Sequence, residues 1–173
     1  MADLGIPISE LVGDELETLK QRIIANIQAA GAVATGKTIQ SLYVQRRTDG
    51  GALVFHGKMP FGVLETGRKG GKVPKGFASI IYDWMQAKGV HGLPMPYLTA
   101  RQHKYTPQER GDRTLAYFIS RKIAREGSQL FRQGGRDTIY SNEIPQTVST
   151  IKKTLLQLMV TEFKSIKLNN LTQ

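Results

Sequence analysis

The chain has 173 residues, of which 40% are hydrophobic and 22% are charged; this composition excludes a disordered protein and suits one domain of ordinary size. It contains no cysteine and only three histidines, which excludes disulfides, thiolate metal sites and cysteine nucleophiles, and leaves little for a zinc site or a catalytic triad. The 24 basic and 14 acidic residues give a net charge of +10, which favours a polyanionic neighbour, either nucleic acid or an acidic protein surface.

The first element expected in the chain is a long amphipathic helix. Residues 1–8 are predicted to be a loose arm, and Ser9 is a good cap for a helix over residues 10–30. Apolar residues recur along this helix at steps of three and four, namely Val12, Leu16, Leu19, Ile23, Ile27 and Ala30. Gly31 then lies where the C-terminal cap of a helix belongs.

Residues 31–38 match the P-loop pattern G-x-x-x-x-G-K-[ST] letter for letter. A P-loop needs a buried strand before its first glycine, whereas the residues before Gly31 have a helical period. The aspartate that would bind magnesium should follow an apolar strand, but the one candidate, Asp83, lies in a run with a helical pattern. We therefore interpret Gly31 and Gly36 as glycines that end or turn the backbone, and Lys37 as a solvated charge. We expect no nucleotide cofactor.

A β-hairpin followed by a helical turn is expected next. Residues 42–48 and 52–56 favour two strands, and the intervening Asp49-Gly50-Gly51 is a good turn sequence. In residues 58–67, Phe61 and Leu64 have the spacing of a helical turn, and Gly67 fits its C-cap. Glu65 suits either a catalytic carboxylate or a structural ion pair or cap; we favour the structural role because no second positioned carboxylate or histidine is near.

Two later segments concentrate basic residues. Residues 68–76 are rich in glycine and suit either a contact with phosphates or carboxylates, or a flexible solvated loop. Residues 90–113 are interrupted by prolines and are predicted to be a long loop that contacts a partner. The candidate interface residues in these two segments are Arg68, Lys69, Lys72, Lys75, Met95, Tyr97, Leu98, Arg101 and Lys104.

Helices are predicted on both sides of the second basic segment. Over residues 77–88, Phe77, Ile81 and Trp84 share one face and Gly89 ends the helix. Over residues 114–126 the residues expected to face inward are Leu115, Phe118, Ile119 and Ile123, and those expected to face outward are Arg121, Lys122 and Arg125. Phe131 is expected to fill a gap in the connector that follows.

The chain is predicted to end with a short strand and a long helix. Residues 136–140 favour the strand, and Ser141 or Asn142 caps the helix. Its apolar stripe consists of Ile144, Val148, Ile151, Leu155, Met159, Phe163 and Ile166. This stripe either covers the sheet or packs in part against a neighbouring subunit, and residues 167–173 are predicted to be a frayed tail.

Together these elements predict a single domain over residues 1–173 with an α+β fold. A small antiparallel sheet would be packed by the N-terminal helix and the long C-terminal helix, with extended basic loops. No apolar run has the length that spans a membrane, and the N-terminus has no visible secretory signal, so a soluble protein is expected.

Two short motifs point to a family. The first is a Thr-Gly-x-x-x-x-Ser-Leu run formed by Thr35, Gly36, Ser41 and Leu42, and the second is an aromatic-x-x-Leu-Glu-x-Gly segment formed by Phe61, Leu64, Glu65 and Gly67. With an N-terminal helix before them and a hairpin between them, these motifs, over residues 10–68, resemble the tail-completion or neck proteins of tailed bacteriophages.

The resemblance implies a small α+β domain that assembles with itself into a ring at the junction of the capsid portal and the tail. Its partners would be portal or adaptor proteins and tail proteins. It would be located in the virion after assembly in the bacterial cytoplasm, without a cofactor, metal or catalytic residue and without a membrane. The basic residues would then face either the packaged DNA, in non-specific contact, or acidic surfaces of adjacent proteins.

The competing class is a basic nucleic-acid-binding module, suggested by the net charge. The sequence has no recognition-helix signature, zinc spacing or aromatic-rich platform for single strands, which argues against that class. An enzyme is the third hypothesis and depends on the P-loop match alone.

Overall fold

The computed structural model describes residues 8–46, 53–57, 59–97 and 104–169. The chain divides into two compact units. Unit 1 contains residues 1–31, 39–58 and 137–173, and unit 2 contains residues 32–38 and 59–136. The expected single domain over residues 1–173 stays a prediction.

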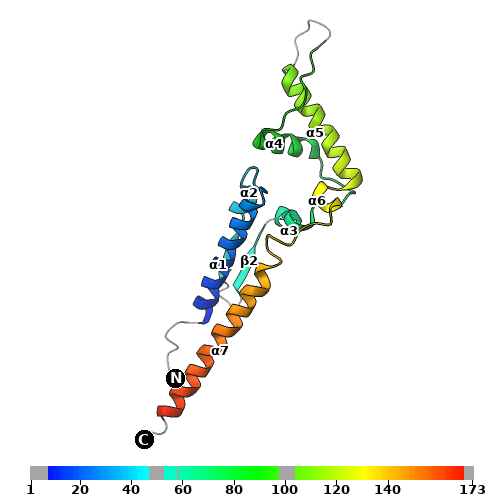
Figure 1. Ribbon diagram of the computed structural model, residues 1–173. Coiled ribbons are helices and arrows are strands. Elements are labelled where there is room, and N and C mark those ends of the chain that lie inside the picture. The colour runs from blue at the N-terminus through cyan, green and yellow to red at the C-terminus, as the bar shows by residue number, and fades with distance from the viewer. Residues whose placement is uncertain (1–7, 47–52, 58, 98–103, 170–173) are drawn as a thin grey trace. The chain divides into compact units, whose positions relative to one another are not determined.

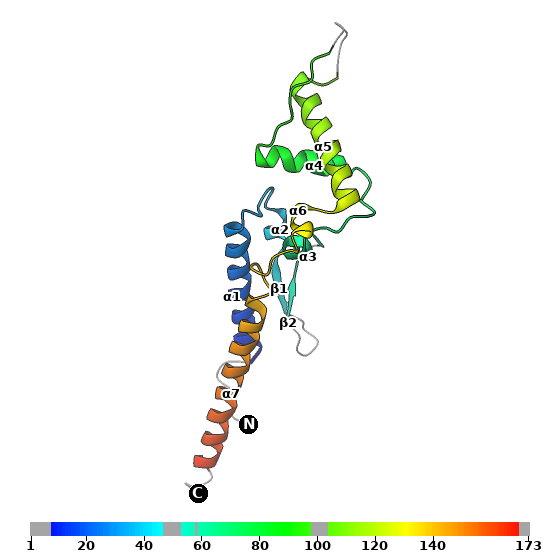
Figure 2. The same cartoon turned by 45° about the vertical axis from the view of Figure 1, so that its right-hand side comes forward.

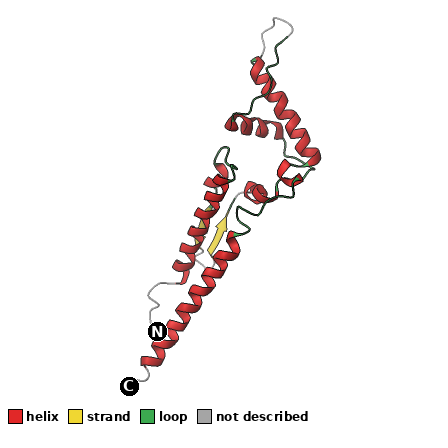
Figure 3. Cartoon of the chain, in the orientation of Figure 1, coloured by secondary structure: helices red, strands yellow, loops and turns green. Residues whose placement is uncertain are grey.

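The protein is mainly helical, with 65% of the described residues in helices (Figure 3). Over the described ranges, the β structure is limited to β1 (Tyr43–Arg46) and β2 (Leu53–His56), four residues each, which pair antiparallel. The predicted α+β fold organised on a small sheet is therefore wrong. Two short strands offer too little surface to organise a core, so the apolar side chains are buried mainly between helices.

Unit 1 consists of two long antiparallel helices and the β1–β2 pair. Helices α1 (Ile8–Ala29) and α7 (Glu143–Asn169) lie side by side, and the two strands pack against α1 (Figures 1 and 2). The buried apolar residues of this unit are Leu19, Ile23, Ile27, Leu42 and Ile139. Three of them belong to the stripe predicted on α1, so the stripe points inward as its period requires.

Polar contacts join the C-terminal part of α1 to the start of α7. The amide Nδ2 of Asn26 donates to the carbonyl oxygen of Ile139 at 3.2 Å and to Oε1 of Glu143 at 3.3 Å. Residues 138–142 before α7 form turns, so the strand predicted over residues 136–140 is wrong. The helix also continues to Asn169 instead of fraying from residue 167.

The end of α1 confirms the expected cap. Gly31 has a φ of 60°, and its N–H donates to the carbonyl oxygen of Gln28 at 2.9 Å. A helix, not a strand, therefore precedes the segment that matches the P-loop pattern. A short helix, α2 (Lys37–Gln40), follows this segment.

Unit 2 contains the remaining helices: α3 (Met59–Thr66), α4 (Phe77–Lys88), α5 (Pro107–Glu126) and α6 (Gln129–Arg132). Its core forms where α4 packs on α5, around Ile81, Met85 and Ala116. The predicted bounds of α4 are confirmed. Trp84 was predicted to face inward, but it is 41% exposed. The adjacent Met85 is fully buried in its place.

Helix α5 begins at Pro107, which corrects the prediction of a loop up to residue 113. Thr106 and Glu109 form a capping box: the Glu109 N–H donates to Oγ1 of Thr106 at 3.2 Å, and the Thr106 N–H donates to Oε2 of Glu109 at 2.9 Å. Pro107 occupies the first turn, where its missing N–H costs nothing. The proline that suggested a loop therefore marks the start of a helix.

Candidate functional site

The residues of the first family-like motif lie in both units. Ser41 and Leu42 belong to unit 1, just before β1, and Leu42 is buried. Thr35 and Gly36 belong to unit 2. Gly36 has a φ of 72°, a left-handed conformation that favours glycine, which agrees with its interpretation as a backbone position.

The second motif forms a structural joint between α3 and α6. Gly67 has a φ of 69°, and a Cβ at this position would lie 2.3 Å from the backbone nitrogen of Phe131 in α6. The carbonyl oxygens of Leu64 and Glu65 accept hydrogen bonds from Nε and the backbone N–H of Arg136, both at 2.9 Å. Glu65 itself is 2% exposed. Leu64, Glu65 and Gly67 thus join α3 to α6 and to Arg136, and Phe61 is half-buried.

The basic segment after Gly67 is fixed by its backbone to the end of α5. The N–H of Gly71 donates to the carbonyl oxygen of Ala124 at 2.7 Å, and the N–H of Ser128 donates to that of Arg68 at 2.8 Å. The Arg68 guanidinium lies 5.2 Å from the ring centre of Phe77. The backbone of the segment is therefore attached to α5 and to the residue after its C-cap, at Gly71 and Arg68, while Lys69, Lys72 and Lys75 are exposed; both alternatives for this segment stay predictions.

The proline-containing segment before α5 is also held in place. The N–H of Met95 donates to the carbonyl oxygen of Pro107 at 2.9 Å. The Arg110 guanidinium lies 4.5 Å from the ring centre of Tyr97, and Nζ of Lys104 lies 5.4 Å from that of Tyr105. The other two interface candidates, Leu98 and Arg101, lie outside the described residues.

A buried carboxylate, Asp112, organises the contact between this segment, α4 and α5. Oδ1 accepts from the Gly92 N–H at 2.7 Å and from Nε2 of Gln108 at 2.8 Å, while Oδ2 lies 3.0 Å from Nε2 of Gln86 and 3.2 Å from Nδ1 of His91. Burial raises the pKa of Asp112, but these four hydrogen bonds outweigh it and lower the pKa from 3.8 to about 2. The carboxylate is thus kept ionised as a structural centre.

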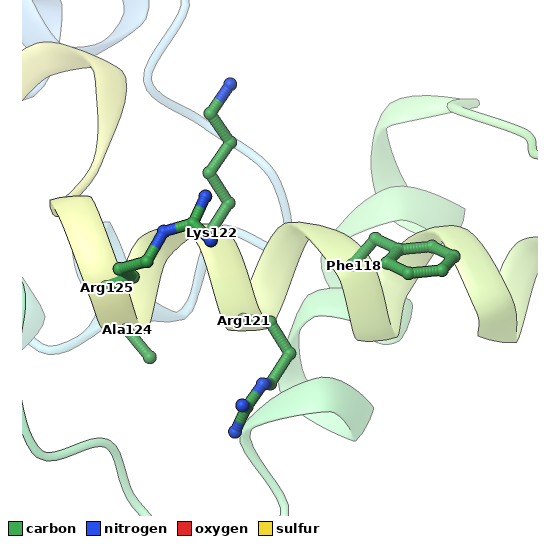
Figure 4. Close-up of a pocket in the computed structure, with 5 residues that line it drawn as sticks. All are labelled: Phe118, Arg121, Lys122, Ala124 and Arg125. Carbon is green, nitrogen blue, oxygen red and sulfur yellow. The ribbon is translucent and has the colours of Figure 1, made fainter.

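The outward face of α5 combines cations with an exposed aromatic ring. Phe118, Arg121, Lys122, Ala124 and Arg125 line an open hollow of about 520 Å³ (Figure 4). The outward positions predicted for the three cations are confirmed. Phe118 was predicted to face inward, but it is 63% exposed.

The exposed face of α7 is apolar. Leu156, Met159, Val160 and Phe163 follow a spacing of three or four residues and are exposed by 61%, 54%, 50% and 68%; we call them the α7 surface. Of the predicted stripe, Ile151 and Leu155 are half-buried, whereas Ile144, Val148, Met159 and Phe163 are exposed. Thr147 and Leu158 are also buried or half-buried, so only part of the stripe faces inward.

Among the described residues, no group of three or more histidine, aspartate and glutamate side chains is placed to hold a metal ion. No described helix combines the length and apolar character that crossing a membrane requires. The chain matches no known family model, curated protein or solved structure.

Two features of these sites were missed in the sequence for different reasons. The capping box at Thr106 was visible as a Thr-x-x-Glu pattern and could have placed the start of α5. The role of Asp112 was not visible, because its partners come from α4, from the segment after α4 and from α5, and only the fold brings them together.

Proposed function

We propose that this chain is a structural virion protein of a tailed bacteriophage, which assembles with itself into a ring in the neck and joins the portal complex to the tail. The proposal starts from the two family-like motifs, whose residues form turns and joints of the fold. In this role the protein binds other proteins and catalyses no reaction.

The observation on which the proposal chiefly depends is the α7 surface. Four large apolar side chains lie on one face of a helix, each at least half exposed. Isolated apolar residues are normal on a protein surface, whereas a contiguous row of them is typical of an interaction site. In Figures 1 and 2 the C-terminal end of α7 extends beyond the start of α1, so α1 cannot cover it.

The balanced charge of unit 1 favours a second copy of the chain as the partner that binds the α7 surface. Unit 1 contains nine basic and nine acidic residues, so two copies can meet through this unit without net repulsion. Exposed Glu10 and Asp14 on α1 offer carboxylates to the exposed Lys164 beside Phe163 on α7. Repetition of such a contact around an axis closes a ring, in which each single interface can be modest.

The test is the oligomeric state of the full chain measured by light scattering and native mass spectrometry. We expect an oligomer whose population increases with concentration. The double variant Met159→Gln and Phe163→Gln keeps residues that favour a helix. It removes two apolar side chains from each contact, and the free energy of association should weaken by about 3 kcal/mol or more. This corresponds to more than about a hundredfold in affinity, so the variant should be monomeric.

Ile80→Gln is the matched control, because Ile80 is 51% exposed on α4 in unit 2, and this variant should assemble normally. Electron microscopy of the chain co-expressed with phage portal and tail proteins then tests its place in the neck. A chain that stays monomeric at all concentrations and joins neither portal nor tail proteins would contradict the proposal.

A further inference from the structure

The net charge of the chain is confined to one of its two units. Unit 2 contains 15 basic and 5 acidic residues, whereas unit 1 contains 9 of each. The whole surplus of +10 therefore belongs to unit 2. A basic composition spread evenly would indicate only solubility, but a surplus confined to one unit indicates a surface for a polyanion.

The five acidic residues of unit 2 are too few to balance its 15 basic residues, and most of them are buried or already engaged in contacts. Glu65 and Asp112 are buried, with 2% and 3% exposed. Glu109 is engaged in the capping box of α5. Glu126 is held by Arg125 and Arg132, whose nearest contacts lie at 2.6 and 3.4 Å. Among the described residues of this unit, Asp83 is the one acidic residue that is exposed and engaged in none of these contacts.

Basic residues of two segments that are distant in the sequence lie at the C-terminal half of α5. Arg121, Lys122 and Arg125 line the hollow beside Phe118. The bond from the Gly71 N–H to the carbonyl oxygen of Ala124 brings the backbone between Lys69 and Lys72 to the same end of the helix. We call these residues, Lys69, Lys72, Phe118, Arg121, Lys122 and Arg125, the α5 surface.

The dimensions of this surface match a phosphate backbone. From residue 118 to residue 125 an α-helix rises about 10 Å, and one strand of duplex DNA places a phosphate every ~3.4 Å of its axis. The face thus spans about three phosphates. Phe118 is the single aromatic ring among the described residues that line the hollow, whereas sites for single strands stack successive bases on several rings.

We infer that the α5 surface binds the backbone of duplex DNA without sequence preference. The Arg125–Glu126 pair does not block this, because the Arg125 side chain is 78% exposed and exposed pairs are weak and readily exchanged. The inference is independent of the proposed role in the neck, because it depends on unit 2 alone.

The test is binding of the full chain to a labelled duplex of mixed sequence, followed by fluorescence anisotropy over a range of salt concentrations. The logarithm of the binding constant should fall linearly with the logarithm of salt concentration. The variant Arg121→Gln with Lys122→Gln removes two phosphate contacts from exposed helix positions, so the slope should become less steep by about 1.8. Lys69→Gln with Lys72→Gln should have a similar effect.

The matched control is Lys152→Gln with Lys153→Gln, an equal change of charge at exposed positions of α7, and its slope should equal that of the unmodified chain. An equal decrease of the salt slope in the control and in the α5 variants would overturn the inference, because net charge alone would then explain binding. Binding of polyglutamate in preference to the duplex would overturn it in favour of an acidic protein partner.

A single-stranded oligonucleotide of equal length and the variant Phe118→Leu complete the design. Binding of the single strand in preference to the duplex, lost in Phe118→Leu, would overturn the inference in favour of base stacking. The oligomeric state of each variant is measured in parallel. Variants that assemble normally but keep the original slope would refute the DNA surface and leave the proposed assembly intact.

Discussion

At the scale of single residues, Asp112 determines how the segment after α4 lies against α5. Its four hydrogen bonds come from Gln86, His91, Gly92 and Gln108. A buried carboxylate is costly unless it is fully hydrogen-bonded, and here the bonds more than compensate for burial. The stability of unit 2 should therefore depend on the ionisation of this one group.

Asp112→Asn should destabilise the protein by about 1–3 kcal/mol at pH 7, because the amide Nδ2 would face the donor groups that now approach Oδ2. The folded state has the lowered pKa of about 2 against an ordinary 3.8. The carboxylate's contribution is thus fully present above the ordinary pKa and is lost as pH falls towards about 2. Melting curves from pH 7 to pH 2 should show the two proteins converging below pH ~4. Asp83→Asn, at an exposed carboxylate of α4, is the control, and a difference that does not change with pH would contradict the prediction.

Gly111 allows the backbone of the Gly92–Leu93 segment to lie directly on the first turns of α5. A Cβ at Gly111 would lie 2.0 Å from the carbonyl oxygen of Leu93, and backbone atoms cannot give way as a flexible side chain does. Gly111→Ala should therefore destabilise the protein by about 1–3 kcal/mol or more, measured by thermal unfolding. Gly62→Ala is the opposite case, because α3 has open space there, and it should be neutral or stabilise by up to about 1 kcal/mol. Equal melting temperatures for the two variants would refute the close contact.

At the scale of elements, the capping box explains why α5 is longer than its apolar period suggests. Its first turns contain Gly111 and Asp112, which are buried against the preceding segment, so they show no apolar pattern to count. A helix of this kind is defined by its cap and its packing, not by a hydrophobic stripe.

Thr106→Ala should destabilise the protein by about 1 kcal/mol, since the Glu109 N–H loses its side-chain acceptor. Hydrogen exchange should become faster in the first turn of α5 and stay unchanged in α4. Thr114→Ala is a control within the same helix, because its hydroxyl bonds back to the carbonyl oxygen of Arg110 at 2.8 Å and does not cap the end. Unchanged exchange at residues 108–110 of the Thr106 variant would contradict the assigned cap.

At the scale of the whole molecule, the two candidate surfaces have different chemistry and belong to different units. The α7 surface is apolar and lies in unit 1, whose charges balance; the α5 surface is cationic and lies in unit 2, which has the entire surplus. This separation is what allows variants at either surface to be tested without disturbing the other.

The sequence by itself determined the elements that depend on local patterns. The helical period of α1 and α4, their terminal glycines and the antiparallel pairing of β1 with β2 were predicted from neighbouring residues alone. The position of Gly67 at the end of α3 also followed from local turn chemistry.

The tertiary structure decided which side chains are buried and which charges lie together. Met85 is buried where Trp84 was expected, and Phe118 is exposed where an inward face was expected. The pattern of one helix gives only its possible faces, and the partner that packs against it selects among them. The mainly helical class and the joining of residues 68–72 to the end of α5 were fixed in the same way, by contacts between segments far apart in the chain.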